Sequence, residues 1–117
     1  MISERFIRTA MLIGEDSVEK LNNCNVLVFG VGGVGGYVVE ALARAGVGSF
    51  TVVDNDVVAL SNINRQIIAT SETVGRDKTE VIKERILSIN PEAKVDARKC
   101  FFMPENADEF DFSAYDY

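Results

Sequence analysis

The feature that most constrains this chain is a glycine-rich loop between an apolar stretch and a stretch rich in alanine and valine. Gly30, Gly32 and Gly35 follow the pattern Gly-x-Gly-x-x-Gly directly after the apolar run 25–29. In such a loop the first glycine makes a tight turn, the second lets a phosphate approach the backbone, and the third lets a helix pack closely on the strand. The position predicts a nucleotide-binding loop, which by itself fits ATP as well as a nicotinamide or flavin dinucleotide.

The rest of the chain alternates between helical and extended patterns. The periodicity predicts, in order, helices over 4–13, behind Ser3 as N-cap, and 17–23, a strand over 25–29, a helix over 35–45, a strand over 49–54, a helix over 77–90, a strand over 94–99 and a short helix with Pro104 in its first turn. Strands separated by helices indicate an α/β fold with a Rossmann-like, doubly wound, mainly parallel sheet. We therefore divide the chain into a helical lead-in, 1–23, and a Rossmann-like half, 24–117.

The sheet is expected to be truncated after its third strand. Residues 113–117 follow the short helix at the point where the alternation calls for a fourth strand. A sheet of three strands leaves a long parallel edge uncovered. We therefore expect the chain to be a fragment, with part of the active site outside it.

Composition excludes several classes of protein. The chain has 117 residues, 47% of them hydrophobic and 26% charged, which suits one globular domain. No apolar run is long enough for a membrane helix and the first residues do not form a signal peptide, so we expect a cytoplasmic protein without membrane contact. Cys24 and Cys100 form no Cys-x-x-Cys motif, and we expect free thiols without a catalytic role.

The net charge of −6 belongs mainly to the end of the chain. Residues 101–117 hold five of the 18 acidic side chains and no lysine or arginine. The remaining residues together have almost no net charge. The composition therefore does not indicate a basic surface that binds nucleic acid, although a local basic patch is compatible with it.

Polar side chains beyond the glycine loop favour ATP over a redox dinucleotide. Asp54 ends the second strand 24 residues after Gly30, where an acid accepts hydrogen bonds from ribose hydroxyls. A polar cluster of Asn62, Asn64, Arg65 and Gln66 follows, for which a redox enzyme has little use. Lys78 begins a helix, where a cation is disfavoured by the helix dipole unless an anion compensates. Cations that converge on a polyphosphate suit phosphoryl or nucleotidyl transfer, so Arg65 and Lys78 are candidate catalytic residues.

These motifs together resemble the adenylation domain of the E1-like superfamily, the ThiF family, which includes ubiquitin-activating enzymes and bacterial enzymes of molybdopterin and thiamin synthesis. The resemblance rests on Gly30-x-Gly-Gly-x-Gly35, Asp54, Ser61-Asn-Ile-Asn-Arg-Gln66 and Lys78, preceded by Arg5-Phe-x-Arg8. Within the superfamily, the stretches RFIRTAMLIGED, GVGGVG, EALARAGVG, SNINRQ and INPEAKV are most similar to the bacterial tRNA threonylcarbamoyladenosine dehydratase branch. The similarity covers nearly all of residues 5–97.

The resemblance implies roles for individual residues. It implies that Arg8 is a catalytic residue that reaches into the site of a partner subunit, and hence a homodimer. It places the Mg²⁺-binding aspartate of the family beyond Tyr117, so no metal ligand is assigned within the chain. It also implies an ATP site lined by Gly30, Gly32, Gly33 and Gly35, with Asp54 on the ribose and Asn62, Arg65 and Lys78 on the phosphates.

The implied reaction is activation of a carboxylate by adenylation. In the dehydratase branch the carboxylate is the threonylcarbamoyl group of a modified adenosine in tRNA, which then cyclises with loss of water without requiring an enzyme cysteine. The alternative substrate in the superfamily is the C-terminal glycine of a ubiquitin-like sulfur-carrier protein, which makes such a protein or a sulfur-transfer protein a second candidate partner beside tRNA. Two other hypotheses remain for the function of the loop: a nicotinamide-linked oxidoreductase and a simple nucleotide-binding module.

Overall fold

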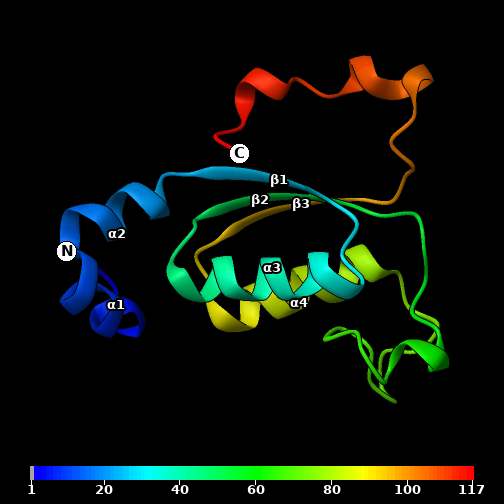
Figure 1. Ribbon diagram of the computed structural model, residues 1–117, viewed down its shortest axis with the longest axis horizontal. Coiled ribbons are helices and arrows are strands. Elements are labelled where there is room, and N and C mark those ends of the chain that lie inside the picture. The colour runs from blue at the N-terminus through cyan, green and yellow to red at the C-terminus, as the bar shows by residue number, and fades with distance from the viewer. Residues whose placement is uncertain (1) are drawn as a thin grey trace.

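Three short strands form a single parallel sheet. In the computed structural model, which describes residues 2–117, they are β1 (Asn25–Phe29), β2 (Ser49–Val53) and β3 (Lys94–Arg98), in the order β1-β2-β3 (Figure 1). Asn25 pairs with Ser49 and Ser49 with Lys94, so the three strands begin in register. The α/β architecture with parallel strands is as predicted, and each strand ends within one residue of its predicted bound.

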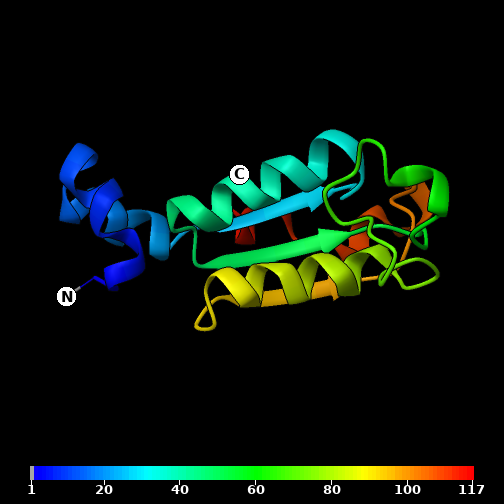
Figure 2. The same ribbon diagram turned by 90° about the horizontal axis from the view of Figure 1, so that it is seen from below.

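Two crossover helices cover one face of the sheet. α3 (Gly33–Ala45) connects β1 to β2, α4 (Lys78–Ile89) precedes β3, and both lie on the same side of the strands (Figure 2). The main core lies between the helices and the sheet. Each fully buried Val, Ile or Phe side chain there stabilises the fold by about 1.5–3 kcal/mol. The members of the core include Val39 and Ala43 of α3, Phe50 and Val52 of β2, and Ile82 and Ile86 of α4. No helix of residues 2–117 is long and apolar enough to cross a membrane.

The ends of α3 differ slightly from the prediction. The helix begins at Gly33, two residues earlier than expected, because Gly32 takes the N-cap position inside the glycine loop. It ends as expected at Gly46, whose φ of 111° is in the left-handed region that favours glycine. The N–H groups of Gly46 and Val47 close the last turn by donating to the carbonyl oxygen of Leu42.

The helical lead-in folds as three short pieces. They are η1 (Glu4–Phe6), a 3₁₀ turn with Ser3 as its N-cap, α1 (Ile7–Ile13) and α2 (Glu15–Asn22). The expected helix over 4–13 therefore starts as a tighter turn, and the second helix starts two residues earlier than predicted. Phe6 and Val18 are buried, and the ring of Phe6 lies against Gly46 at the end of α3.

The C-terminal segment covers part of the face of the sheet that α3 and α4 leave free (Figure 1). It contains two 3₁₀ helices, η3 (Pro104–Glu109) and η4 (Phe112–Ala114), and its aromatic rings pack with Phe29 of β1. The chain then runs along the free edge of β1. Leu27 N–H donates to the carbonyl oxygen of Tyr117 at 2.9 Å, and Asp116 N–H donates to the carbonyl oxygen of Asn25 at 2.8 Å. Residues 116–117 thus pair with the free edge of β1, although the sheet of residues 2–117 has three strands and not a fourth.

Candidate nucleotide-binding site

The candidate site lies at the carboxyl ends of the strands. The loop 30–32 leads from β1 into α3, and the long connection 54–77 between β2 and α4 lies at the same end of the sheet (Figures 1 and 2). Parallel sheets bind their ligands at this edge, because the loops from neighbouring strands converge there with the amino termini of the helices. The fold therefore brings the glycine loop and the polar stretch after Asp54 together, as the sequence predicts.

Backbone geometry explains two of the glycines. Gly30 has a φ of 83°, which a residue with a side chain adopts only under strain, and it makes the expected tight turn. A Cβ atom on Gly35 would lie 1.8 Å from the carbonyl oxygen of Gly30, so the helix can approach the strand this closely only without a side chain there. Both features hold the first turn of α3 against the loop, with its N–H groups free of partners inside the helix.

Gly32 and Gly33 lie where the loop becomes the helix, and Gly32 has a neighbour that the sequence analysis did not assign to the site. A Cβ atom on Gly32 would lie 2.7 Å from Oε1 of Gln66. That oxygen is buried and has no hydrogen-bond partner among the described residues. Gln66 is therefore a further candidate site residue. The sequence indicated it only as a member of the polar cluster after Asp54, without a role of its own.

Asp54 holds the glycine loop in place. Its Oδ2 accepts a hydrogen bond from Val31 N–H at 2.9 Å, and its Oδ1 accepts one from Asp56 N–H at 2.9 Å. Each carboxylate oxygen retains a further lone pair, which is available to a ribose hydroxyl. The predicted ribose acceptor thus also links the end of β2 to the loop after β1.

Asn62 and Arg65 both make contacts within their own loop. Asn62 is buried, and its Oδ1 accepts the N–H of Ala59 at 2.9 Å, which fixes the turn η2 (Leu60–Asn62). Arg65 is exposed, and its Nη1 donates to the carbonyl oxygen of Ser61 and to Oδ1 of Asn64, each at 2.9 Å. Asn62 shapes the loop, whereas the guanidinium of Arg65 stands at its surface.

Lys78 is a buried cation at the first residue of α4. Only 8% of its side chain is exposed, and Nζ lies 3.9 Å from Oδ2 of Asp56, the limit of an ion pair. The dipole of α4 is positive at this end, so the position is unfavourable for a cation and favourable for an anion beside it. Lys78 is therefore well placed to contact an anionic ligand.

A second lysine, which the sequence analysis did not identify, lies near this helix end. Lys99 follows β3, and its Nζ pairs with Oδ1 of Asp77 at 2.8 Å. Asp77 is the N-cap of α4 and immediately precedes Lys78. The ion pair therefore connects the end of β3 to the start of α4, where Lys78 lies. In the sequence, only the position of Lys99 directly after the strand could have suggested this contact.

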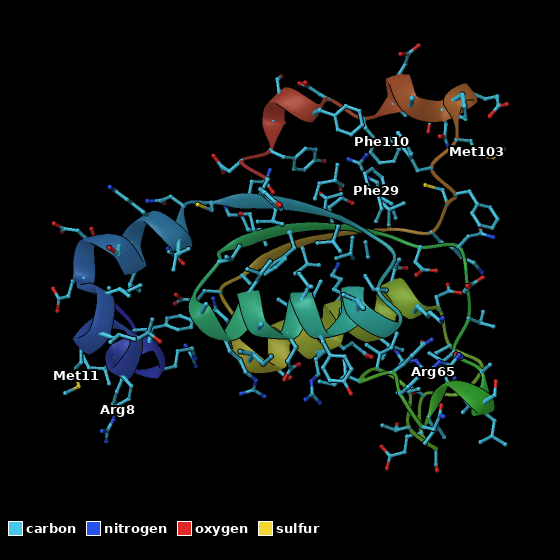
Figure 3. All side chains as sticks on the ribbon, viewed as in Figure 1. Arg8, Met11, Phe29, Arg65, Met103 and Phe110 are labelled. Carbon is cyan, nitrogen blue, oxygen red and sulfur yellow. The ribbon has the colours of Figure 1, made fainter. Side chains whose placement is uncertain are left out.

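Arg8 lies apart from all of these residues. It is an exposed residue of α1, at the opposite end of the molecule from Arg65 (Figure 3). Figure 1 places α1 and the loop that begins α3 at opposite ends of the molecule, so one copy of the chain does not bring Arg8 to its own glycine loop.

A small cavity adjoins Asp54 on the side of the sheet that faces the C-terminal segment. Its volume is about 220 Å³, and its lining includes Phe29, Gly30, Asp54, Cys100 and Phe101. Both thiols of the chain are free and half-buried, and Cys100 contributes to this wall. The cavity combines apolar rings with one carboxylate, a lining suited to a flat heterocycle next to a sugar.

The fold and these contacts define a Rossmann-like nucleotide-binding domain with a carboxylate beside its glycine loop and cations beyond it. Comparison with known families then identifies the branch: the ThiF family model matches residues 6–117. The chain belongs to the ThiF family.

Individual relatives are similar over nearly the whole chain. The tRNA threonylcarbamoyladenosine dehydratase of Haemophilus influenzae is 45% identical over 114 residues, 97% of this chain and 44% of that protein. The crystal structure of E. coli tRNA N6-threonylcarbamoyladenosine dehydratase in complex with ATP is 42% identical with a TM-score of 0.89, over 93% of this chain and 46% of that chain. The sulfur carrier protein adenylyltransferase of Thermus thermophilus is 38% identical over 106 residues, 89% of this chain and 39% of that protein. This chain therefore spans less than half the length of these relatives.

Proposed function

We propose that this chain forms the ATP-binding part of an enzyme that activates a carboxylate by adenylation. The observation that carries the proposal is Lys78, a buried cation at a helix amino terminus whose nearest carboxylate is 3.9 Å away. A polyphosphate would supply the missing negative charge. Asp54 beside the glycine loop supports the same ligand, because it can accept the ribose hydroxyls while it holds the loop. A relative that is 42% identical has been crystallised with ATP.

The residues suit nucleotidyl transfer. A substrate carboxylate oxygen attacks the α-phosphorus of ATP, the bond from the α-phosphorus to the bridging oxygen breaks, and pyrophosphate leaves with that oxygen. Lys78 and Arg65 would stabilise the negative charge that grows on the leaving group, and the N–H groups at the start of α3 would hold the phosphates. The product is an acyl-adenylate, from which a second nucleophile displaces AMP.

The cavity next to Asp54 is our candidate for the adenine subsite. The apolar rings of Phe29 and Phe101 offer surfaces on which a base can pack, and Asp54 lies in the same wall. With the base there, the ribose would face Asp54 and the phosphates would extend toward the start of α3.

We propose the threonylcarbamoyl group of modified adenosine in tRNA as the carboxylate that is activated. The support is the 45% identity to a tRNA threonylcarbamoyladenosine dehydratase over 97% of the chain. The carbamoyl group of the substrate would then attack its own activated carbonyl and close a ring with net loss of water, so no enzyme thiol is needed. The 38% identity to a sulfur carrier protein adenylyltransferase supports the alternative, adenylation of the C-terminal glycine of a ubiquitin-like protein. We propose that the reaction takes place in the cytoplasm, where ATP and tRNA both occur.

ATP ordinarily reacts with Mg²⁺ bound to its phosphates. Within residues 2–117, no group of three Asp, Glu, Cys or His side chains is arranged to hold a metal ion. The donors present do not form a magnesium site by themselves, and the aspartate that the family resemblance places beyond Tyr117 stays a prediction.

We also propose a homodimer in which each subunit supplies Arg8 to its partner. Two exposed apolar surfaces support it. Met11 and Leu12, beside Arg8 on α1, are 77% and 85% exposed, and Val34, next to the glycine loop on α3, is 80% exposed, with Tyr37 one turn further along. A two-fold pair could cover these surfaces and bring Arg8 to the loop of the other subunit.

Pyrophosphate exchange tests the proposed reaction. Only an adenylating enzyme returns labelled pyrophosphate to ATP in the presence of its carboxylate substrate. In the full-length protein we expect exchange with threonylcarbamoyl-tRNA. Exchange only with a sulfur-carrier protein would select the alternative, and the absence of exchange with either substrate, together with binding of a nicotinamide cofactor, would overturn the proposal.

Subunit mixing tests the dimer. Full-length Arg8→Ala and full-length Lys78→Ala subunits should each be inactive alone, because an arginine supplied in trans to a phosphoryl transition state contributes about 10³–10⁵ in rate. A hybrid dimer contains one site with both residues intact, so mixing should restore part of the activity. A mixture as inactive as its parents, despite measured subunit exchange, would contradict the shared site.

A further inference from the structure

A second hollow lies at the other end of α3, where α3 and α4 both finish. Its volume is about 340 Å³, and it is lined by Arg5, Arg44, Arg85, Ser88 and Ile89. Arg44 is in the last turn of α3, about 16 Å along the helix axis from Gly33 at 1.5 Å per residue. The hollow is therefore separate from the glycine loop and from the cavity beside Asp54.

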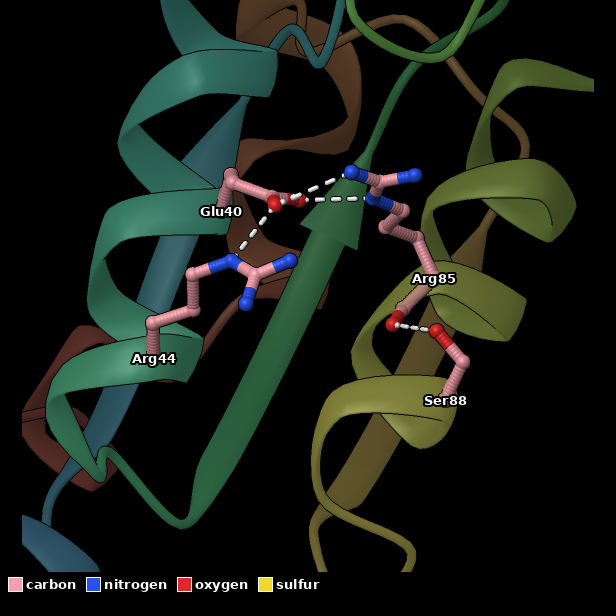
Figure 4. Close-up of polar contacts among 4 residues, drawn as sticks. All are labelled: Glu40, Arg44, Arg85 and Ser88. Carbon is pink, nitrogen blue, oxygen red and sulfur yellow. Dashed lines mark hydrogen bonds and ion pairs between the residues drawn. The ribbon is translucent and has the colours of Figure 1, made fainter. Parts of the chain in front are cut away.

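The positive charge around this hollow exceeds the negative charge. Glu40 on α3 is the carboxylate that contacts the arginines: Arg85 donates to it from Nε at 2.7 Å and from Nη2 at 3.0 Å, and Arg44 from Nε at 2.7 Å (Figure 4). Arg5 takes part in no ion pair of residues 2–117, and its Nη1 donates to the hydroxyl of Ser3 at 3.0 Å. Two guanidinium groups thus share Glu40, and Arg5 has no carboxylate partner among residues 2–117, so three positive charges face one negative charge.

Glu40 also orients the arginines. It is held by Arg85 through two hydrogen bonds but by Arg44 through one, which leaves the terminal nitrogens of Arg44 and Nη1 of Arg85 as donors around the hollow. Guanidinium groups fixed in this way lose less conformational entropy when they bind an anion than free arginines do. The lining has a single apolar side chain, Ile89, so it suits a small, fully charged group.

We propose that this hollow, the arginine site, binds a phosphate of an RNA backbone. The proposal rests on tRNA as the substrate in the proposed function and assigns the surface that holds it away from the reacting base. Guanidinium groups pair with phosphate oxygens in a planar, bidentate geometry, and an RNA strand carries one phosphate per nucleotide. The 16 Å from the glycine loop corresponds to a few nucleotides, so a strand whose base reacts at the loop can reach the site.

The test measures affinity of the protein for a fluorescein-labelled tRNA anticodon stem–loop by anisotropy over a series of KCl concentrations. Arg44→Ala and Arg5→Ala should each weaken binding about fivefold to tenfold and reduce the slope of log affinity against log salt by roughly 0.7–0.9, the value for one lost phosphate contact. Arg85 is left in place because it neutralises Glu40. Ser88→Glu, which adds a carboxylate to the wall at an exposed position, should weaken binding at least as much.

The matched control is Arg76→Ala, which also removes one arginine. Arg76 lies outside the hollow, and its charge is already neutralised by Glu84 at 2.6 Å. It should bind RNA as the parent protein does, and calorimetric titration should give unchanged ATP affinity for all four variants.

Two results would overturn the arginine site: Arg5→Ala, Arg44→Ala and Ser88→Glu variants that bind RNA with parental affinity and salt slope, or an equal loss in Arg76→Ala. Failure of the proposed substrate looks different, because the parent protein would then not bind the stem–loop at all. Circular dichroism melts of each variant separate loss of the fold from loss of the site.

Discussion

The two ends of α3 are built in different ways. At the amino end the structure depends on backbone atoms and on the absence of side chains, since Gly35 lies against the carbonyl oxygen of Gly30. At the carboxyl end it depends on long charged side chains, with Glu40 held between Arg44 and Arg85. The first arrangement is fixed by sterics and the second by electrostatics. Adding a single carbon atom should therefore disturb the amino end of α3, whereas changes of charge or pH should disturb its carboxyl end.

The largest effect is expected from Gly35→Ala. Its new Cβ would overlap a backbone oxygen at 1.8 Å, so α3 must move away from β1, and we expect a loss of about 3 kcal/mol or more in the free energy of unfolding. Urea denaturation followed by circular dichroism measures it. Gly32→Ala is the matched control, because its Cβ meets only the end of the flexible Gln66 side chain. Equal stability of the two variants would contradict the steric argument.

A substitution at Gly32 should affect ligand binding and leave folding nearly unchanged. We expect Gly32→Val to cost the fold little and to abolish ATP binding, because the branched side chain would occupy space that a phosphate needs. Calorimetric titration with ATP measures this effect, and unchanged affinity would show that the loop serves only packing.

Lys78→Ala should weaken ATP binding by roughly 2–5 kcal/mol if the cation contacts a desolvated phosphate. AMP binding should change much less, because AMP lacks the outer phosphates. Arg65→Ala should follow the same pattern with a smaller effect, since its guanidinium is exposed. Titrations of both variants with ATP and with AMP measure the contrast, and equal losses for the two nucleotides would place these cations away from the outer phosphates.

The smallest effect is expected at the carboxyl end of α3. The hydrogen bond from Arg85, assisted by Arg44, holds the pKa of Glu40 below its ordinary value of 4.5, although burial opposes this. Ionised Glu40 therefore stabilises the fold above pH 4.5, and this contribution is lost as the pH falls through the lowered pKa. Glu40→Gln should cost about 1 kcal/mol at pH 7, discounted because Arg85 is partly exposed.

Melting temperatures of the parent and Glu40→Gln proteins between pH 3 and pH 7 check this pH dependence. The difference should stay constant at neutral pH and shrink as the pH falls below 4.5. A difference that persists unchanged at pH 3 would show that Glu40 acts through packing and not through its charge.

Much of the candidate site could be predicted because it consists of short segments that follow strands. The glycine loop and Asp54 both stand directly after apolar runs, and parallel strands bring their carboxyl ends to one edge. Helix starts were predicted less well: α3 begins at Gly33 because the N-cap lies inside the loop itself. Gln66 was not assigned a role of its own and Lys99 was missed, because their importance comes from contacts with Gly32 and Asp77, which are distant in the sequence.

The sequence by itself determined the glycine loop, the parallel α/β order and the similarity to the ThiF family, because each depends on residue types at short, fixed spacings. Only the tertiary structure decided which distant side chains meet. It buried Lys78 next to Asp56, and it brought Arg5, Arg44 and Arg85 around one hollow although eighty positions separate the first from the last. Such charged groups carry no periodic signal of their own. Arg44 and Arg85 meet because apolar contacts in the core pack α3 against α4. Arg5 reaches the same hollow because Phe6, the next residue, lies against Gly46 at the end of α3.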